Sequence, residues 1–271
     1  MKDLFDIKNR VVVVTGATGV LAGATARYLA KCGARVAFIG RDAAKLADIE
    51  KFIADNGCDA LAIRADVLSR DDLLAARKAV LDKWGTVDCL VNGAGGNRAG
   101  AVIPPEKSFF DLDLGAWEDV FKLNMEGTLL PIIAFGEIFQ KNKKGVIVNF
   151  SSMTAQQAVT RVLGYSNAKA AVDNLTKWLA VEFAKKIGDG VRVNAVAPGF
   201  FLSEQNRTLL TNPDGSLTER GYDIVKATPF ARFGEADEVF GAIHYLCSDA
   251  SKFVTGTVLA IDGGFSCFSG V

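Results

Sequence analysis

The chain has 271 residues, of which 49% are hydrophobic and 23% are charged, a composition typical of a globular protein with a large core. Basic and acidic residues both number 31, so the formal net charge is zero. A nucleic acid or an anionic membrane would select clustered positive charge, so neither is expected as the main partner. The single histidine and the five scattered cysteines predict neither a metal site nor a disulfide framework.

The first ten residues are charged and lead directly into an apolar run, so no signal peptide is expected. Apolar stretches stay shorter than the ~18 residues that a membrane span needs. We therefore expect a soluble, cytoplasmic protein.

Short β-branched runs alternate with longer amphipathic patterns along the chain. The predicted strands are residues 11–15, 35–39, 60–64, 88–91, 145–150, 191–196 and 257–261. The predicted helices are residues 21–32, 42–54, 70–84, 114–141, 164–186 and 236–246, with Pro131 expected to kink the fourth. Most strands are apolar throughout, as strands covered on both faces must be. The alternation predicts a single α/β domain over residues 1–271, with a doubly wound (Rossmann) parallel seven-stranded sheet and helices on both faces.

Residues 200–234 interrupt this alternation. They contain no clear strand, and Asn212-Pro213-Asp214-Gly215 is a strong turn signal. The segment follows the sixth strand, so it lies at the carboxyl edge of the sheet, where open α/β folds bind ligands. Apolar residues such as Leu210 and Phe230 can anchor it. We expect a substrate lid rather than a disordered linker.

The first strand leads through Thr15-Gly16-Ala17-Thr18-Gly19 into a helix that begins near Val20. Glycines in such a turn let the backbone approach a pyrophosphate, whose charge is bound by free N–H groups at the helix N-terminus. An ordinary tight turn can have the same composition. Its position between the first strand and the first helix nevertheless favours a dinucleotide site.

The second strand ends in Ile39-Gly40-Arg41. Sites that prefer NAD usually have an acidic residue here to accept the ribose hydroxyls, but Gly40 takes that place. Arg41 follows, where a guanidinium can bind a 2′-phosphate. The sequence favours NADP(H), with NAD(H) the alternative if Arg41 stacks on the adenine or points to solvent.

Tyr165 and Lys169 are one helical turn apart and share one face of a predicted helix. Free tyrosine and lysine side chains have pKa values of about 10 and about 10.4, and a neighbouring ammonium lowers the pKa of a phenol. Ser152 follows the fifth strand, where its hydroxyl can reach the same substrate oxygen. A surface helix often carries such a pair by chance, so the surrounding motifs decide.

These motifs together resemble the short-chain dehydrogenase/reductase family over essentially the whole chain. The matching features are the glycine turn, Asp66, Asn92-Gly93-Ala94-Gly95, Asn124, Ser152, Tyr165, Lys169, Pro198-Gly199 and Asp262-Gly263-Gly264. Two places differ from the family pattern. Val20 and Ala22 stand where its turn usually has glycines, and Gly93 stands where it usually has a second asparagine.

The resemblance implies an NAD(P)-dependent oxidoreductase and a role for each matching residue. Tyr165 would exchange a proton with the substrate oxygen, and Ser152 would hydrogen-bond that oxygen. Lys169 would lower the pKa of Tyr165 and hold the nicotinamide ribose, while Asn124 would position a water that relays protons to it. Asp66 would contact the adenine. The implied cofactor-binding residues are Gly16, Thr18, Gly19, Val20, Leu21, Arg41, Asp66, Val67, Asn92, Gly93, Ala94, Tyr165, Lys169, Pro198, Gly199, Phe201 and Ser203.

The displaced glycine turn, residues 93–97 and the C-terminal tail resemble one branch of the family, the D-mannonate oxidoreductases or fructuronate reductases. This branch implies a role in carbohydrate metabolism, the interconversion of a hexuronate ketone and an aldonate alcohol. Such a substrate needs a cation for its carboxylate and amides for its hydroxyls. The candidates are Asn97, Arg161, Gln205, Asn206 and Arg207, each of which could instead be a solvated loop residue.

Two other functions stay open. A general carbonyl reductase, such as a 3-oxoacyl reductase, would use the same catalytic residues, although polar residues 205–207 disfavour a long acyl chain. A nucleotide-sensing protein could keep the fold without turnover, but it would have no need of the proton-transfer residues. The family also implies a homotetramer or homodimer, in which the aromatic C-terminal tail either caps its own core or reaches a neighbouring subunit.

Overall fold

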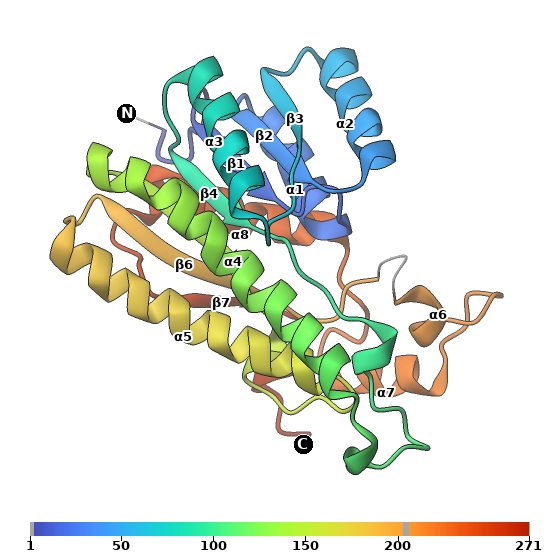
Figure 1. Cartoon of the computed structure of the whole chain (residues 1–271). Helices are drawn as coiled ribbons and strands as arrows, with labels where there is room; N and C mark the ends of the chain where they lie inside the picture. Colours follow the sequence, from blue (N-terminus) through green and yellow to red (C-terminus); the bar gives the residue numbers. More distant parts are fainter. Residues whose placement is uncertain (1–2, 203–205, 271) are drawn as a thin grey trace.

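A parallel sheet of seven strands lies at the centre of the computed structural model, which describes residues 3–202 and 206–270 (Figure 1). The strand order is β3-β2-β1-β4-β5-β6-β7. The strands are β1 Val11–Thr15, β2 Arg35–Gly40, β3 Ala60–Arg64, β4 Cys89–Asn92, β5 Gly145–Phe150, β6 Val191–Pro198 and β7 Val258–Ile261. The chain reverses its direction along the sheet between β1 and β4, and ligands of open α/β sheets bind at such a switch point.

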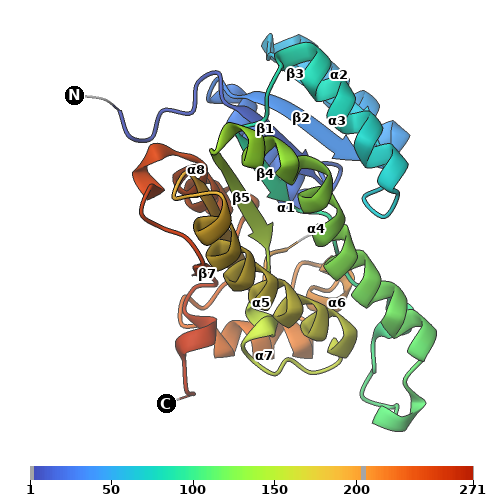
Figure 2. The same cartoon turned by 60° about the vertical axis from the view of Figure 1, so that its left-hand side comes forward.

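Helices cover both faces of the sheet because alternate side chains of each strand point to opposite faces. Val12 and Val14 pack in a core with α1 (Val20–Lys31), α2 (Ala43–Asn56) and α8 (Phe240–Cys247). On the other face, Val11 and Val13 pack with α3 (Arg70–Trp84), α4 (Leu114–Asn142) and α5 (Leu163–Lys186). Figure 2 shows α4 and α5 side by side on this second face. The predicted single-domain Rossmann fold is therefore confirmed.

Short polar side chains begin several of these helices. Asp42 accepts a hydrogen bond from the backbone N–H of Lys45 at the start of α2, and Ser69 accepts one from Asp72 at the start of α3. These caps satisfy N–H groups that have no partner within the helix. Asp113 caps α4 in the same way. Pro131 lies inside α4, as predicted, and the helix runs to Asn142, one residue beyond its predicted end.

The 200–234 segment contains two short helices that the sequence analysis did not predict, α6 (Arg207–Leu210) and α7 (Glu219–Ala227). Both are shorter than the window of about 11 residues over which an apolar periodicity can be recognised. The predicted turn is present, since the N–H of Gly215 donates to the carbonyl of Asn212 at 2.9 Å. Figure 1 places α6 and α7 together at one end of the sheet. The predicted helix at 236–246 is instead a 3₁₀ turn (Ala236–Val239) followed by α8.

Within the described part of the chain, every helix is too short or too polar to cross a membrane. The assembly into a homotetramer or homodimer stays a prediction. Exposed apolar side chains on α5, Trp178 and Val181, favour such an assembly.

Candidate active site

The glycine turn after β1 brings the backbone of two loops into close contact. Gly16 has a φ of +66°, and a Cβ there would lie 2.6 Å from the backbone of Gly93, which follows β4. Gly19 precedes α1, and no side chain caps that helix. The first N–H groups of α1 are thus available to an anion, so a pyrophosphate can bind at this helix N-terminus.

The two differences from the family pattern compensate each other in space. A Cβ at position 93 would lie 2.4 Å from the Cβ of Ala22 and 3.0 Å from the carbonyl oxygen of Thr15. Ala22 therefore fits only because residue 93 is glycine. Gly23, the displaced glycine, lets α1 pack on the turn, since a Cβ there would lie 2.5 Å from the carbonyl oxygen of Ala17. The altered turn is a repacked form of the family's turn.

The predicted adenosine end of the site is a cavity of about 470 Å³ between this turn and the ends of β2 and β3. Arg41 and Lys45 line it, together with Val67. A Cβ at Gly40 would lie 2.4 Å from the Cγ2 atom of Thr18, so an acidic residue cannot occupy position 40 unless the Thr18 side chain moves.

Asp66 lies beside this cavity and is not among its lining residues. Its carboxylate accepts hydrogen bonds from the backbone N–H of Leu68 at 3.0 Å and from the Arg41 guanidinium at 3.3 Å. Asn92 lies behind the cavity, where its amide donates to Asn149 at 2.9 Å. Direct contact of these two residues with a nucleotide stays a prediction.

The catalytic candidates meet where β5 ends. Lys169 of α5 is buried, and its ammonium donates to the carbonyl of Phe150 at 2.7 Å. The same ammonium lies 5.4 Å from the ring centroid of Tyr165, one helical turn earlier. Ser152, two residues beyond Phe150, lines the same cavity as Tyr165 and lies close enough to act on the pKa of its hydroxyl. The structure thus brings Ser152, Tyr165 and Lys169 together at the carboxyl edge of the sheet.

Burial dominates the electrostatics of this cluster. It raises the pKa of Tyr165, and the nearby Ser152 offsets this only in part. The sequence analysis expected a lowered Tyr165 pKa, which the structure does not show, because desolvation of the phenolate is the larger effect. Burial also lowers the pKa of Lys169 to about 8, against an opposing attraction from Asp173. Tyr165 is therefore protonated at neutral pH, as a proton donor to a carbonyl must be.

The side-chain amide of Asn124 on α4 forms hydrogen bonds with backbone groups. It donates to the carbonyls of Gly96 at 2.7 Å and Val120 at 2.8 Å, and it accepts from the N–H of Gly96 at 3.1 Å. A Cβ at Gly95 would lie 2.5 Å from the Asn124 Oδ1 atom and 3.3 Å from the Lys169 ammonium. Asn124 thus fixes the loop that passes beside Lys169, while its role toward a water stays a prediction.

A cavity of about 260 Å³ joins the cofactor turn to the catalytic cluster. Together with the adenosine cavity it is lined by most of the predicted cofactor residues, namely Gly16, Thr18, Gly19, Val20, Leu21, Arg41, Val67, Gly93, Ala94, Tyr165, Lys169, Pro198, Gly199 and Phe201. Asn206 also lines it. Ser203 and Gln205 lie outside the described residues.

The other predicted substrate residues lie apart from this cavity. Asn97 is exposed and accepts a hydrogen bond from the N–H of Arg98 at 3.0 Å. Arg207 on α6 is exposed as well. Arg161 lines a separate cavity, which borders Phe200. Phe200 also lines the catalytic cavity, whereas the sequence analysis proposed only its neighbour Phe201 as a site residue.

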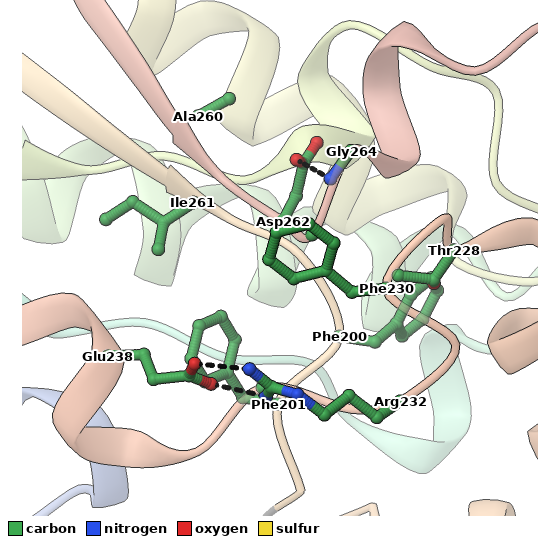
Figure 3. Close-up of a pocket in the computed structure, with 12 residues that line it drawn as sticks. Phe200, Phe201, Thr228, Phe230, Arg232, Glu238, Ala260, Ile261, Asp262 and Gly264 are labelled. Carbon is green, nitrogen blue, oxygen red and sulfur yellow. Dashed lines mark hydrogen bonds and ion pairs between the residues drawn. The ribbon is translucent and has the colours of Figure 1, made fainter.

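A further cavity of about 350 Å³ lies between the 200–234 segment and β7. Figure 3 shows the Arg232 guanidinium and the Glu238 carboxylate pointing toward each other beside it, joined at 2.7 Å and 2.6 Å. Asp262 accepts from the N–H of Gly264 at 2.9 Å. These contacts attach the end of the segment to the domain. Among the described residues, no group of three or more His, Cys, Asp or Glu could hold a metal ion.

The turn, the two adjoining cavities and the Ser152–Tyr165–Lys169 cluster have the geometry of a nicotinamide-dependent oxidoreductase. Comparisons with known proteins agree. Residues 16–266 match the family model described as enoyl-(acyl carrier protein) reductase. The uncharacterized oxidoreductase UxuB of Bacillus subtilis is 42% identical over 98% of both chains.

Two solved structures are similar over 98% of both chains. One is a proposed D-mannonate oxidoreductase from Haemophilus influenza with bound NAD, at 39% identity and a TM-score of 0.92. The other is a gluconate 5-dehydrogenase from Burkholderia cenocepacia in complex with NADP and tartrate, at 29% identity and a TM-score of 0.86. The chain belongs to the short-chain dehydrogenase/reductase family and is an NAD(P)-dependent oxidoreductase acting on CH–OH groups.

The compensation between Ala22 and Gly93 predicts an energetic coupling. Gly93→Asn should lower the free energy of unfolding by about 1–3 kcal/mol, because the new side chain meets Ala22. Ala22→Gly in the same chain should recover part of that loss, with a coupling energy of about 0.5–3 kcal/mol. Urea unfolding of the wild type, both single variants and the double variant measures it. Strict additivity would show that the two positions are independent.

Tyr165→Phe tests the proton donor. The variant should lose roughly 10²–10⁴-fold in turnover on any ketone that the wild type reduces, because the phenol alone carries the transferred proton. Binding of reduced cofactor, followed by its fluorescence, should be unchanged. Tyr245→Phe on α8 is the matched control and should keep full turnover. Full turnover by Tyr165→Phe would remove the assigned role.

Proposed function

We propose that the enzyme transfers a hydride between nicotinamide and a sugar acid, with D-fructuronate and D-mannonate as the substrate pair. The strongest support is the likeness over 98% of both chains to the proposed D-mannonate oxidoreductase from Haemophilus influenza. The gluconate 5-dehydrogenase with bound tartrate adds support, since that protein also takes a hydroxy acid by name. The polar Asn206 beside the catalytic cluster suits a hydroxylated substrate.

The residues divide the reduction of the ketone between them. Bound NAD(P)H supplies the hydride to the carbonyl carbon. The Ser152 hydroxyl hydrogen-bonds the carbonyl oxygen and aligns it with the Tyr165 hydroxyl. Tyr165 donates its proton to that oxygen as the negative charge develops. Lys169 then stabilises the resulting phenolate, because an ammonium nearby favours the charged form.

Oxidation of the alcohol runs the same steps in reverse. Tyr165 must then be deprotonated, and its raised pKa makes that form scarce at neutral pH. Reduction is therefore favoured at neutral pH, and oxidation gains as the pH rises toward the Tyr165 pKa.

A spectrophotometric screen tests the substrate. Purified enzyme should oxidise NAD(P)H with D-fructuronate and reduce NAD(P)⁺ with D-mannonate. The kcat/KM for D-fructuronate should exceed that for 3-oxoacyl thioesters by roughly 10²-fold or more, because an acyl chain leaves the polar groups of a site built for hydroxyl groups without hydrogen-bond partners. Ketohexoses and polyols serve as uncharged references. Faster turnover of a 3-oxoacyl thioester than of every sugar acid would make the enzyme a general carbonyl reductase.

We further propose that the enzyme prefers NADP(H). Unless its side chain moves, Thr18 leaves no room for an acidic side chain at position 40, and the Asp42 carboxylate is engaged at the start of α2. Arg41 and Lys45 both line the adenosine cavity, where their charges suit a 2′-phosphate. To bind the 2′-phosphate, Arg41 would have to break its ion pair with Asp66. This pair is partly exposed and contributes little to stability.

Arg41→Ala should separate the two cofactors. We expect kcat/KM to fall by roughly 10-fold or more for NADPH, because a charge-assisted contact with phosphate is lost, and to stay nearly constant for NADH. The matched control is Arg64→Ala, which removes an arginine from the neighbouring strand end outside the adenosine cavity. Equal losses with NADPH and NADH would exclude a phosphate contact by Arg41.

A further inference from the structure

A cavity of about 480 Å³ lies between α7 and the loop that precedes α5. Two arginines line it, Arg161 from the loop and Arg220 from α7. Phe200 forms part of its wall and also borders the cavity that contains Tyr165. The two cavities therefore adjoin at Phe200.

The two arginines lie close enough in this cavity for their charges to interact. Burial, and then the positive charge of Arg161, lower the pKa of Arg220, and the negative charge of Asp223 opposes them only in part. In the described part of the chain neither guanidinium forms an ion pair. Glu219 and Asp223 also line the cavity, but both residues are exposed, whereas the two arginines are half-buried. Like charges held together in this way cost stability unless an anion joins them.

The backbone holds both arginines in unfavourable positions. Arg161 has a φ of +76°, a conformation that costs energy for a residue other than glycine and persists only where the surrounding structure holds it. Arg220 lies in the first turn of α7, where the helix dipole disfavours a cation and favours an anion. Its guanidinium contacts Thr160 through the hydroxyl at 3.4 Å and the carbonyl at 3.3 Å. That contact holds it next to Arg161.

We infer that Arg161 and Arg220 together bind the carboxylate of the substrate. This inference rests on the proposed sugar-acid function and adds Arg220, α7 and this cavity to it. A carboxylate between the two guanidiniums removes their repulsion and accepts charge-assisted hydrogen bonds from both. The carbon chain then passes Phe200 toward Tyr165. Arg220 belongs to the 200–234 segment and Arg161 to the loop that precedes α5. A bound carboxylate that contacts both therefore also links the segment to the active site.

Binding to the enzyme saturated with reduced cofactor tests the site without turnover. Isothermal titration calorimetry should show that the wild type binds D-mannonate at least 10-fold more tightly than D-mannitol, its uncharged analogue. Arg161→Gln and Arg220→Gln should each lose most of that preference. Arg220→Lys should keep part of it. Lys226→Gln, the same charge change on the outer side of α7, is the matched control and should keep all of it.

Steady-state kinetics then separates this inference from the proposed function. If D-fructuronate is a substrate, the two Gln variants should raise its KM by 10-fold or more, whereas Lys226→Gln should leave that KM unchanged. Turnover of D-fructuronate with an unchanged KM in both variants would overturn the arginine site and leave the function standing. Arginine-dependent binding of D-mannonate without any hexuronate turnover would overturn the proposed function and leave the arginine site standing. Equal affinity of the wild type for D-mannonate and D-mannitol, or no binding of either, would overturn the inference.

Discussion

The contact on which the site depends is the hydrogen bond from the buried Lys169 ammonium to the carbonyl of Phe150. A cation in the interior is costly unless polar groups receive it, and here the last residue of β5 does so. The bond joins α5 to the end of the strand that continues into Ser152. It thereby fixes Ser152 and Tyr165 relative to each other, which is what proton transfer to a single substrate oxygen requires.

A buried carboxylate on the same helix supports this arrangement. Asp173 lies one turn beyond Lys169 and accepts a hydrogen bond from Ser151. Its negative charge opposes the effect of burial on Lys169, while burial raises its own pKa. Tyr165, Lys169 and Asp173 follow one face of α5 at successive turns. The helix therefore presents a phenol at the cavity, with a cation and then an anion behind it.

The cofactor turn shows that a family pattern can change by paired replacement. Read along the chain, Ala22 and Gly93 are two separate departures, and they cast doubt on the phosphate contacts. In the fold they are one change, because the methyl group of Ala22 occupies the space that a side chain at position 93 would need. Sequence reasoning could not pair them, since the contact joins α1 to the end of β4 and no spacing rule connects the two.

The sequence by itself determined the order of strands and helices, since apolar runs with β-branched residues and amphipathic periods are local signals. It also predicted that Ser152, Tyr165 and Lys169 meet, because Ser152 follows a strand of the parallel sheet and Tyr165 and Lys169 share one face of the next helix. Only the tertiary structure decided the pKa of Tyr165, because desolvation depends on everything packed around the phenol. It alone brought Arg220 near Arg161, because α7 is too short to be recognised from its sequence. The cavity that the two arginines line exists only once the 200–234 segment has folded back onto the sheet.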